Sequence, residues 1–120
     1  MQLTTVDLIA NPCDDEEDNM ALLGCQDLAG NMFLMTRFPE ENEVGISLDL
    51  EEEPYLLRDF KVTLSAERLL IEVDPQDKEA LHGKDFLEIL HNTDPADLPE
   101  VLETLQNILA GTGTLINELS

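Results

Sequence analysis

Two short runs of carboxylates are the residues of this sequence whose types and spacing point most directly to chemistry. They are Asp14, Asp15, Glu16, Glu17, Asp18 and Glu51, Glu52, Glu53. Adjacent carboxylates bind calcium in loops of suitable geometry, attract a basic protein, or keep a surface in water. The residues around each run decide among these three uses.

The first run does not fit a calcium-binding EF-hand loop. When Asp14 takes the first position, the sixth position, which needs Gly, is Asn19, and the twelfth, which needs Glu, is Cys25. The residues on both sides have strand character, whereas an EF-hand loop joins two helices. We therefore predict a solvated acidic loop over residues 11–19 and not a metal site.

The sequence also lacks the usual catalytic and zinc-binding patterns. Cys13, Cys25, His82 and His91 do not have the spacing of zinc ligands, and both cysteines are expected to be free thiols. There is no GxSxG motif, no Gly-rich phosphate-binding loop and no HExxH motif. Carboxylates are so numerous that a pair of them is a weak sign of acid and base catalysis. We expect no metal, no cofactor and no enzymatic activity.

The charge balance limits the partners of the chain. Its 120 residues include 27 Asp and Glu against 6 Lys and Arg, which gives a net charge of -21. A charge of this sign repels phosphate backbones and anionic lipids, so binding to nucleic acid or to a membrane is not expected. The sequence has neither a signal-peptide pattern nor a long apolar run, which predicts a cytoplasmic protein.

The elements that position the acidic runs are mainly strands. Hydrophobic residues make up 42% of the chain, which is enough for a single domain over residues 1–120. Apolar and polar residues alternate over residues 44–51, which predicts a half-buried strand. They alternate again over 60–65, and the β-prone run 68–73 that follows predicts a hairpin. Further strands are predicted at residues 4–9, 20–25, 32–36 and 86–90.

Two helices are predicted in the second half of the chain. An Asp-Pro pair at residues 74 and 75 and a His-Gly pair at residues 82 and 83 are typical of the start and end of a short helix. Residues 98–109 carry an apolar stripe at helical spacing, which is expected to cover the protein's own core. Asp97, with a glutamate three residues later, predicts a capping box, and Asp94 is the alternative cap.

Together these elements predict an α+β fold. An antiparallel sheet of about six strands is expected with a short helix, and a C-terminal amphipathic helix packs on one face. Met20, Met32 and Met35 are expected to fill gaps in the core and not to form an adaptable binding surface. Each acidic run stands beside a predicted strand end. If these ends are adjacent, the runs form one acidic rim that attracts a basic protein; the alternative is a solubilising surface without a specific partner.

The order of several local features resembles the immunity protein 10 family of bacterial polymorphic toxin systems. The features are Glu17-Asp18-Asn19 leading into residues 20–24, the strand at 33–37, the acidic turn at 49–51, the run of residues 60–73, Leu81-His82-Gly83 and the closing helix. They cover most of residues 10–110. The likeness lies in their order, because each feature alone is an ordinary strand or turn pattern.

The resemblance implies a small cytoplasmic bacterial protein that binds and neutralises a cognate toxin encoded beside it. Such a toxin is often a nuclease or another enzyme with a basic site, so the expected partner is a protein toxin with a basic surface. We predict that the eight carboxylates of the two acidic runs contact its Lys and Arg residues. The alternative is an acidic type III secretion chaperone that binds an effector segment, although residues 1–10 look like a strand and not like the expected amphipathic helix. A homodimer is left open.

Overall fold

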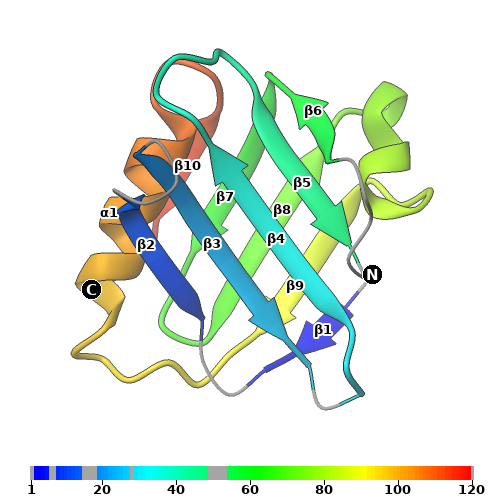
Figure 1. Cartoon of the computed structure of the whole chain (residues 1–120). Coiled ribbons are helices and arrows are strands. Elements are labelled where there is room, and N and C mark those ends of the chain that lie inside the picture. The colour runs from blue at the N-terminus through cyan, green and yellow to red at the C-terminus, as the bar shows by residue number, and fades with distance from the viewer. Residues whose placement is uncertain (1, 6–7, 15–18, 28, 49–53, 120) are drawn as a thin grey trace.

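The chain folds into two layers of β-sheet (Figure 1). This computed structural model describes residues 2–5, 8–14, 19–27, 29–48 and 54–119, and of Asp14 it describes only the backbone. Within these residues there are two five-stranded sheets, a 3-10 helix and an α-helix. The α+β class predicted from the sequence is confirmed, whereas the prediction of one antiparallel sheet of about six strands is wrong.

One layer, the antiparallel sheet, is built from consecutive strands in the order of the sequence. Its strands are β2 (Ile9–Asp14), β3 (Met20–Gln26), β4 (Met32–Arg37), β5 (Val44–Leu48) and β6 (Tyr55–Leu57). Antiparallel neighbours need only short connections, and each strand here follows the previous one within a few residues. The register shifts between Asn11 and Asp14, which marks a bulge in the edge strand β2.

The other layer, the mixed sheet, has the strand order β1-β9-β8-β7-β10. Its strands are β1 (Gln2–Thr4), β7 (Phe60–Leu64), β8 (Arg68–Val73), β9 (Phe86–Leu90) and β10 (Thr114–Asn117). The hairpin predicted from residues 60–73 is confirmed as β7 and β8. The two edge strands are parallel to their neighbours, since β1 pairs with β9 and β10 pairs with β7. Parallel pairs join distant parts of the chain, which accounts for the difference from a purely antiparallel prediction.

The facing surfaces of the two sheets share one hydrophobic core. Strand alternation turns every second side chain inward, and the inward side chains at the centre of both sheets are at most 1% exposed: Leu23, Phe33, Met35, Ile46, Val62, Leu64, Leu69, Ile71, Leu87 and Ile89. Full burial of one such side chain contributes about 1.5–3 kcal/mol. This shared core holds the two layers together.

Two helices close opposite sides of the sandwich. Helix α1 (Leu98–Leu109) packs against β2, β3, β4 and β10 with its apolar stripe buried, and it lies behind β2 in Figure 1. It therefore contacts both sheets and not one face of a single sheet. The 3-10 helix η2 (Pro75–Leu81) packs against β5 and β6. No helix among the described residues is long and apolar enough to cross a membrane.

Several boundaries differ from the sequence predictions. Thr4 ends β1 and Ile9 begins β2, so the single strand predicted over residues 4–9 is wrong. The loop predicted over residues 11–19 is wrong for its first part, because β2 continues to Asp14. Proline has no backbone N–H to donate to a neighbouring strand. Pro12 is nevertheless tolerated in β2, because β2 is an edge strand. Strands β6 and β10 have no counterpart among the predicted strands.

The helix ends confirm one prediction and overturn another. η2 ends as predicted, with His82 at a φ of 54° and Gly83 at 93°, in the left-handed region that glycine favours. The capping box predicted at Asp97 is wrong, because its side chain makes no capping hydrogen bond. The Oδ1 atom of Asp94 instead accepts a hydrogen bond of 2.9 Å from the backbone N–H of Ala96, which organises the turn before α1.

Candidate partner-binding surface

Of the eight residues predicted to bind a partner, the structure describes only Asp14, and only its backbone. Asp15, Glu16, Glu17, Asp18, Glu51, Glu52 and Glu53 lie outside the described residues. Asp14 is placed by its backbone, which ends β2 and pairs with Met20. The contacts predicted for these carboxylates therefore stay predictions, and the described neighbours show where each run leaves the sheet.

The strand ends beside the two runs lie at opposite ends of the antiparallel sheet. Asp14 pairs with Met20 at the start of β3, beside the end of β4 at Arg37. Leu48, at the end of β5, pairs with Phe33 near the start of β4. Strands of five to seven residues are about 17–24 Å long. These strand ends are therefore not adjacent, and the condition for one continuous acidic rim is not met.

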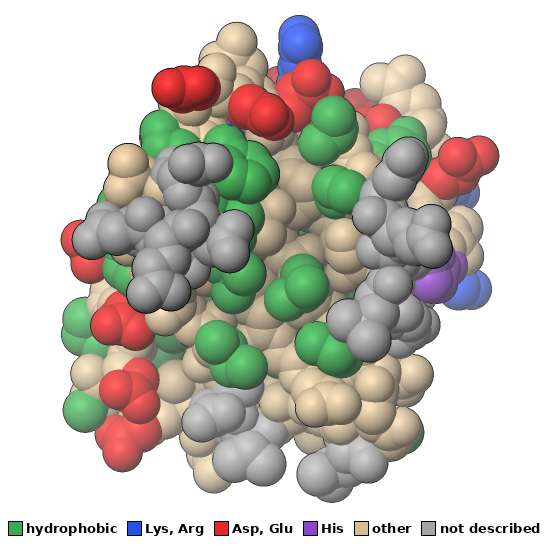
Figure 2. Space-filling view, viewed as in Figure 1, with side chains coloured by type: hydrophobic (Ala, Val, Ile, Leu, Met, Phe, Trp, Pro, Cys, Tyr) green, Lys and Arg blue, Asp and Glu red, His purple; other side chains and the backbone are tan. Residues whose placement is uncertain are grey.

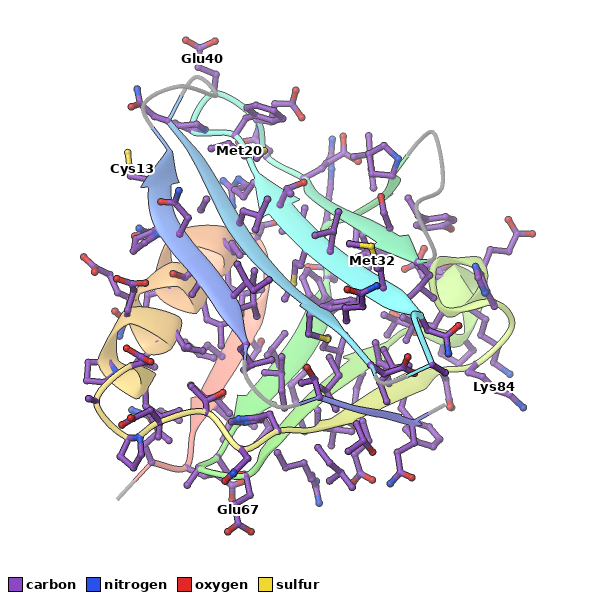
Figure 3. The ribbon with its side chains drawn as sticks, turned by 60° about the horizontal axis from the view of Figure 1, so that its bottom comes forward. Cys13, Met20, Met32, Glu40, Glu67 and Lys84 are labelled. Atoms are coloured by element: carbon purple, nitrogen blue, oxygen red, sulfur yellow. The ribbon has the colours of Figure 1, made fainter. Side chains whose placement is uncertain are left out.

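Further acids gather at the end of the sheet that contains Met20. The connection between β4 and β5 brings Glu40, Glu41 and Glu43 to this end, and the first two are exposed. Glu40 projects outward from this connection, beyond Met20 (Figure 3). A hollow of about 500 Å³ is lined by Asn19, Phe38, Pro39, Glu40 and Glu41. We call Glu40, Glu41 and Glu43 the acidic end.

Arg37 fastens the acidic end to helix α1. Its Nε donates to the backbone carbonyl of Glu41 at 2.7 Å, and its Nη1 donates to the carbonyls of Ile108 and Ala110 at 2.9 and 3.0 Å. The last carbonyls of a helix lack partners within the helix and carry partial negative charge, so they favour a cation. The Arg37 guanidinium thus binds three backbone oxygens, two of them at the C-terminal end of α1.

A second set of contacts fixes the other side of the same connection. The Thr112 hydroxyl lies 2.8 Å from the carbonyl oxygen of Asn42 and 3.0 Å from that of Arg58. Arg58 Nη2 lies 3.6 Å from Glu43 Oε1, and the arginine side chain is 68% exposed. An exposed ion pair contributes only about 0–1 kcal/mol. The hydroxyl contacts therefore anchor this side of the acidic end, while Glu40 and Glu41 face solvent.

The acidic end escaped the sequence predictions although a signal for it is present. Residues 39–43 read Pro-Glu-Glu-Asn-Glu between two predicted strands, which is typical of a charged turn. This segment is less dense in charge than the two acidic runs. Only the strand order shows that it lies beside the end of β2.

The two cysteines are in different environments. Cys25 lies in the core, where burial and, to a smaller extent, the charge of Asp27 raise the pKa of its thiol to about 11. A thiol that stays protonated is a poor nucleophile and a poor metal ligand. Cys13 is exposed in the edge strand β2. Among the described residues, no group of three His, Cys, Asp or Glu side chains is placed to hold a metal ion.

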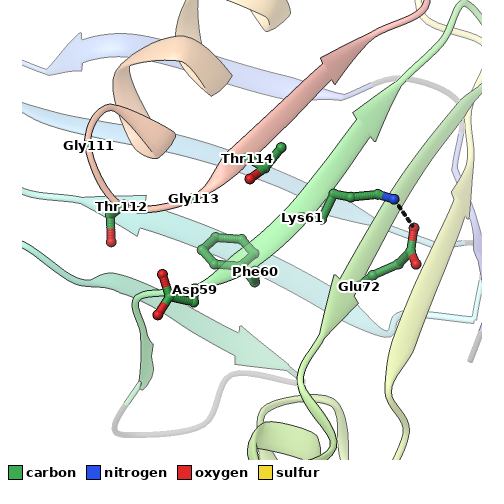
Figure 4. A pocket seen from close by; sticks show the side chains of 8 residues that line it. All are labelled: Asp59, Phe60, Lys61, Glu72, Gly111, Thr112, Gly113 and Thr114. Carbon is green, nitrogen blue, oxygen red and sulfur yellow. Dashed lines mark ion pairs between the residues drawn. The ribbon is translucent and has the colours of Figure 1, made fainter.

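A second hollow, of about 460 Å³, lies where β7 and β10 begin (Figure 4). Its lining residues are Asp59, Phe60, Lys61, Glu72, Gly111, Thr112, Gly113 and Thr114. Lys61 Nζ lies 3.7 Å from Glu72 Oε1, so these two charges offset each other. The Thr112 hydroxyl is already engaged with backbone carbonyls. The acidic end, with two outward carboxylates, is the stronger candidate for a binding site.

Comparisons with known proteins identify no relative. No protein-family model matches the sequence, and searches of curated proteins and of solved structures also find no match. The resemblance to immunity protein 10 therefore stays a prediction.

Proposed function

We propose that this protein is a non-catalytic immunity protein that binds and neutralises a cognate protein toxin with a basic surface. The observation that carries the proposal is the acidic end. Exposed Glu40 and Glu41 lie beside the strand from which the first acidic run leaves, on a chain of net charge -21. The resemblance to immunity protein 10 supplies the class of partner.

The physical role of the acids is to attract and orient a cationic partner. Complementary charge raises the association rate of two proteins by about 10- to 1000-fold and disfavours partners of the same sign. Salt screens this attraction, with a Debye length of about 8 Å at physiological ionic strength. Association with the toxin is therefore fastest at low salt.

The secretion-chaperone alternative gains no support from an observation. It expects an amphipathic helix at the N-terminus, and the described residues there form strands β1 and β2. We propose no second function.

The test uses the toxin domain encoded by the reading frame next to the gene of this protein. The purified domain is bound to the wild type and to the variant Glu40→Gln/Glu41→Gln, and the association rate is measured over a range of salt concentrations. Removal of two outward charges is expected to slow association at low salt by roughly threefold or more, with a smaller difference at high salt. The variant Glu51→Gln/Glu52→Gln/Glu53→Gln tests the second acidic run in the same way.

The matched control is Glu67→Gln/Glu118→Gln. Both residues are exposed, and the variant changes the net charge by the same amount. Glu67 lies at the opposite end of the molecule from Glu40 (Figure 3). A wild type that neither binds nor inhibits the toxin domain contradicts the proposed function. Equal slowing by the control variant shows that overall charge, and not the acidic end, directs association.

A further inference from the structure

The outer face of the antiparallel sheet is apolar. The alternation that buries Leu23 and Met35 turns Leu22 and Leu34 outward. The outward positions with described side chains include Ile9, Met20, Leu22, Met32, Leu34, Pro54 and Leu56, with Asn11, Gly24, Gln26, Thr36, Gly45 and Ser47 between them. We call this set the apolar face. None of the described side chains in this set is charged, although the net charge of the chain is -21; Asp14, which pairs with Met20, is described only by its backbone.

Two glycines let neighbouring side chains lie flat across this face. A Cβ atom at Gly24 would stand 2.7 Å from Leu34 Cδ2, and one at Gly45 would stand 3.0 Å from Pro54 Cβ. Leu34 and Pro54 therefore occupy the space above the glycines and cover the backbone with hydrocarbon. Figure 2 shows apolar side chains across the middle of this face and acidic side chains along its upper margin.

The apolar face is most open to solvent at its two edges, and Leu22 and Leu34 at its centre are half-buried. Ile9 in β2 is 61% exposed and Leu56 in β6 is 48% exposed. Met20 is also partly exposed on this face, and Met32 is partly exposed at the start of β4, so the prediction that they fill the core is wrong. For Met35, which is fully buried, the prediction is confirmed. Contiguous exposed apolar surface commonly marks a site of protein interaction.

The edges of the antiparallel sheet are poor sites for adding a strand. In β2, Pro12 lacks a backbone N–H, and its carbonyl already accepts a hydrogen bond of 2.9 Å from Asn107 Nδ2 in α1. The bulge between Asn11 and Asp14 further interrupts this edge. Strand β6 at the other edge has three residues. Proline, bulges and short edge strands all oppose pairing with another chain, so the face of this sheet is a better docking site than its edges.

Area and charge together select the kind of partner. Five strands about 4.8 Å apart and about five residues long at about 3.4 Å per residue give a face of roughly 400 Å². A stable interface usually covers about 800 Å² on each protein, so the face alone is about half of one. A second copy would bring a further charge of -21 and its own acidic end. A basic partner instead gains contacts at the acidic end, which extends the interface beyond the apolar face.

We infer that the apolar face binds an apolar patch on a basic protein whose surrounding Lys and Arg side chains meet the acidic end. This inference rests on the proposed function and adds where the toxin docks. The two regions have separate kinetic roles, because long-range charge governs association, whereas buried apolar contacts govern dissociation.

The test compares two uncharged double variants in binding to the purified toxin domain of the adjacent reading frame. Ile9→Thr/Leu56→Gln removes hydrocarbon from the apolar face, and Phe86→Gln/Ile116→Thr removes it from the outer face of the mixed sheet, where these side chains are 43% and 37% exposed. The first variant is expected to raise the dissociation rate about tenfold or more, with an unchanged salt dependence of association. The second variant is expected to behave as the wild type.

Each outcome decides between the proposals. Faster dissociation of the first variant alone supports the apolar face as the docking site. Wild-type dissociation of that variant overturns the docking site and leaves the proposed function intact. Failure of the wild-type protein to bind the toxin domain overturns both. Self-association of the wild type in sedimentation, lost in the first variant, shows that a second copy occupies the face and overturns the inferred occupant.

Discussion

The two outer faces of the sandwich come from the same strand alternation but carry different chemistry. On the mixed sheet, Lys61 lies 3.7 Å from Glu72, and Arg68 Nε lies 3.4 Å from Glu88 Oε2, so the outer face carries cross-strand ion pairs beside the exposed Phe86 and Ile116. Among the side chains that the structure describes on the apolar face of the antiparallel sheet, none is charged. The chain has 27 Asp and Glu residues, so a shortage of carboxylates does not explain why the described side chains of the apolar face are uncharged. The two outer faces therefore differ in charge, because ion pairs lie on the mixed sheet and uncharged side chains on the described part of the apolar face.

The largest expected effects come from the inner faces, where the two sheets are alike. Leu23→Ala in β3 and Leu69→Ala in β8 remove side chains that are 0% exposed, and each is expected to lower the free energy of unfolding by about 2–5 kcal/mol. Their outward neighbours, changed by Leu22→Ala and Leu70→Ala, are expected to cost clearly less. Urea denaturation followed by circular dichroism measures all four. If an outward variant lowers the free energy of unfolding as much as its inward neighbour does, the assignment of inner and outer faces is contradicted.

A smaller effect is expected at the contact between the antiparallel sheet and α1. Arg37→Gln removes charged hydrogen bonds to helix carbonyls and is expected to lower the free energy of unfolding by about 1–3 kcal/mol. The control Arg58→Gln removes an exposed arginine and is expected to cost less than about 1 kcal/mol. Equal losses in urea denaturation show that Arg37 does not anchor the helix.

His91 gives a pH-dependent contrast within the mixed sheet layer. It is 5% exposed, its Nδ1 lies 2.9 Å from Thr93 Oγ1, and its Nε2 is buried with no hydrogen-bond partner among the described atoms. Burial lowers the pKa of His91, and the carbonyls of Ser65 and Arg68 and the charge of Glu67 oppose this shift only in part. The folded protein therefore favours the neutral ring.

The unfolded chain binds the proton more readily, so this stabilisation is complete above the ordinary pKa of 6.5 and is lost as pH falls from there toward the folded pKa. One proton changes the free energy of unfolding by at most about 1.4 kcal/mol per pH unit. Because carboxylates also titrate, the measurement is the difference between the wild type and His91→Asn. That difference is expected to shift against the wild type below pH 6.5. A constant difference contradicts the role of burial.

The smallest effects on stability are expected on the two outer faces themselves. Glu72→Gln and Glu88→Gln break partly exposed ion pairs and are each expected to change the free energy of unfolding by less than about 1 kcal/mol. Ile9→Thr and Leu56→Gln are also expected to stay below about 1 kcal/mol, because both side chains are largely exposed. Thermal denaturation checks these values. A large loss in the last two variants means that their binding defect reports misfolding.

Local patterns in the sequence predicted the strands that follow strict alternation. Phe60–Leu64 alternates in full and pairs as a hairpin with the β-prone run Arg68–Val73, and the apolar stripe of α1 is buried as expected. The division into two sheets was not predictable in this way. It depends on β1 pairing with β9 and β10 pairing with β7, contacts between segments far apart in the chain. Strand β6 has only three residues, too few for a periodic signal.

The candidate surface was predictable in its charge but not in its arrangement. The sequence indicates that Glu40 and Glu41 belong to a charged turn. Their position beside the end of β2 follows only from the pairing of β2 with β3, β3 with β4 and β4 with β5. Strand alternation places Leu22 and Leu23 on opposite sides of β3, and Leu34 and Met35 on opposite sides of β4. Because all four residues are apolar, the sequence does not tell which side of each strand faces the core. Only the second layer, packed behind the sheet, shows which apolar rows stay exposed.

The central claim is that the partner docks on the apolar face and not on the mixed sheet. Methyl cross-saturation tests it directly, with this protein deuterated except at its methyl groups and bound to the protonated toxin domain. Transfer is expected to the methyl groups of Ile9, Leu22, Leu34 and Leu56, and none to those of Leu70 and Ile116. Transfer to the second set without the first would contradict it.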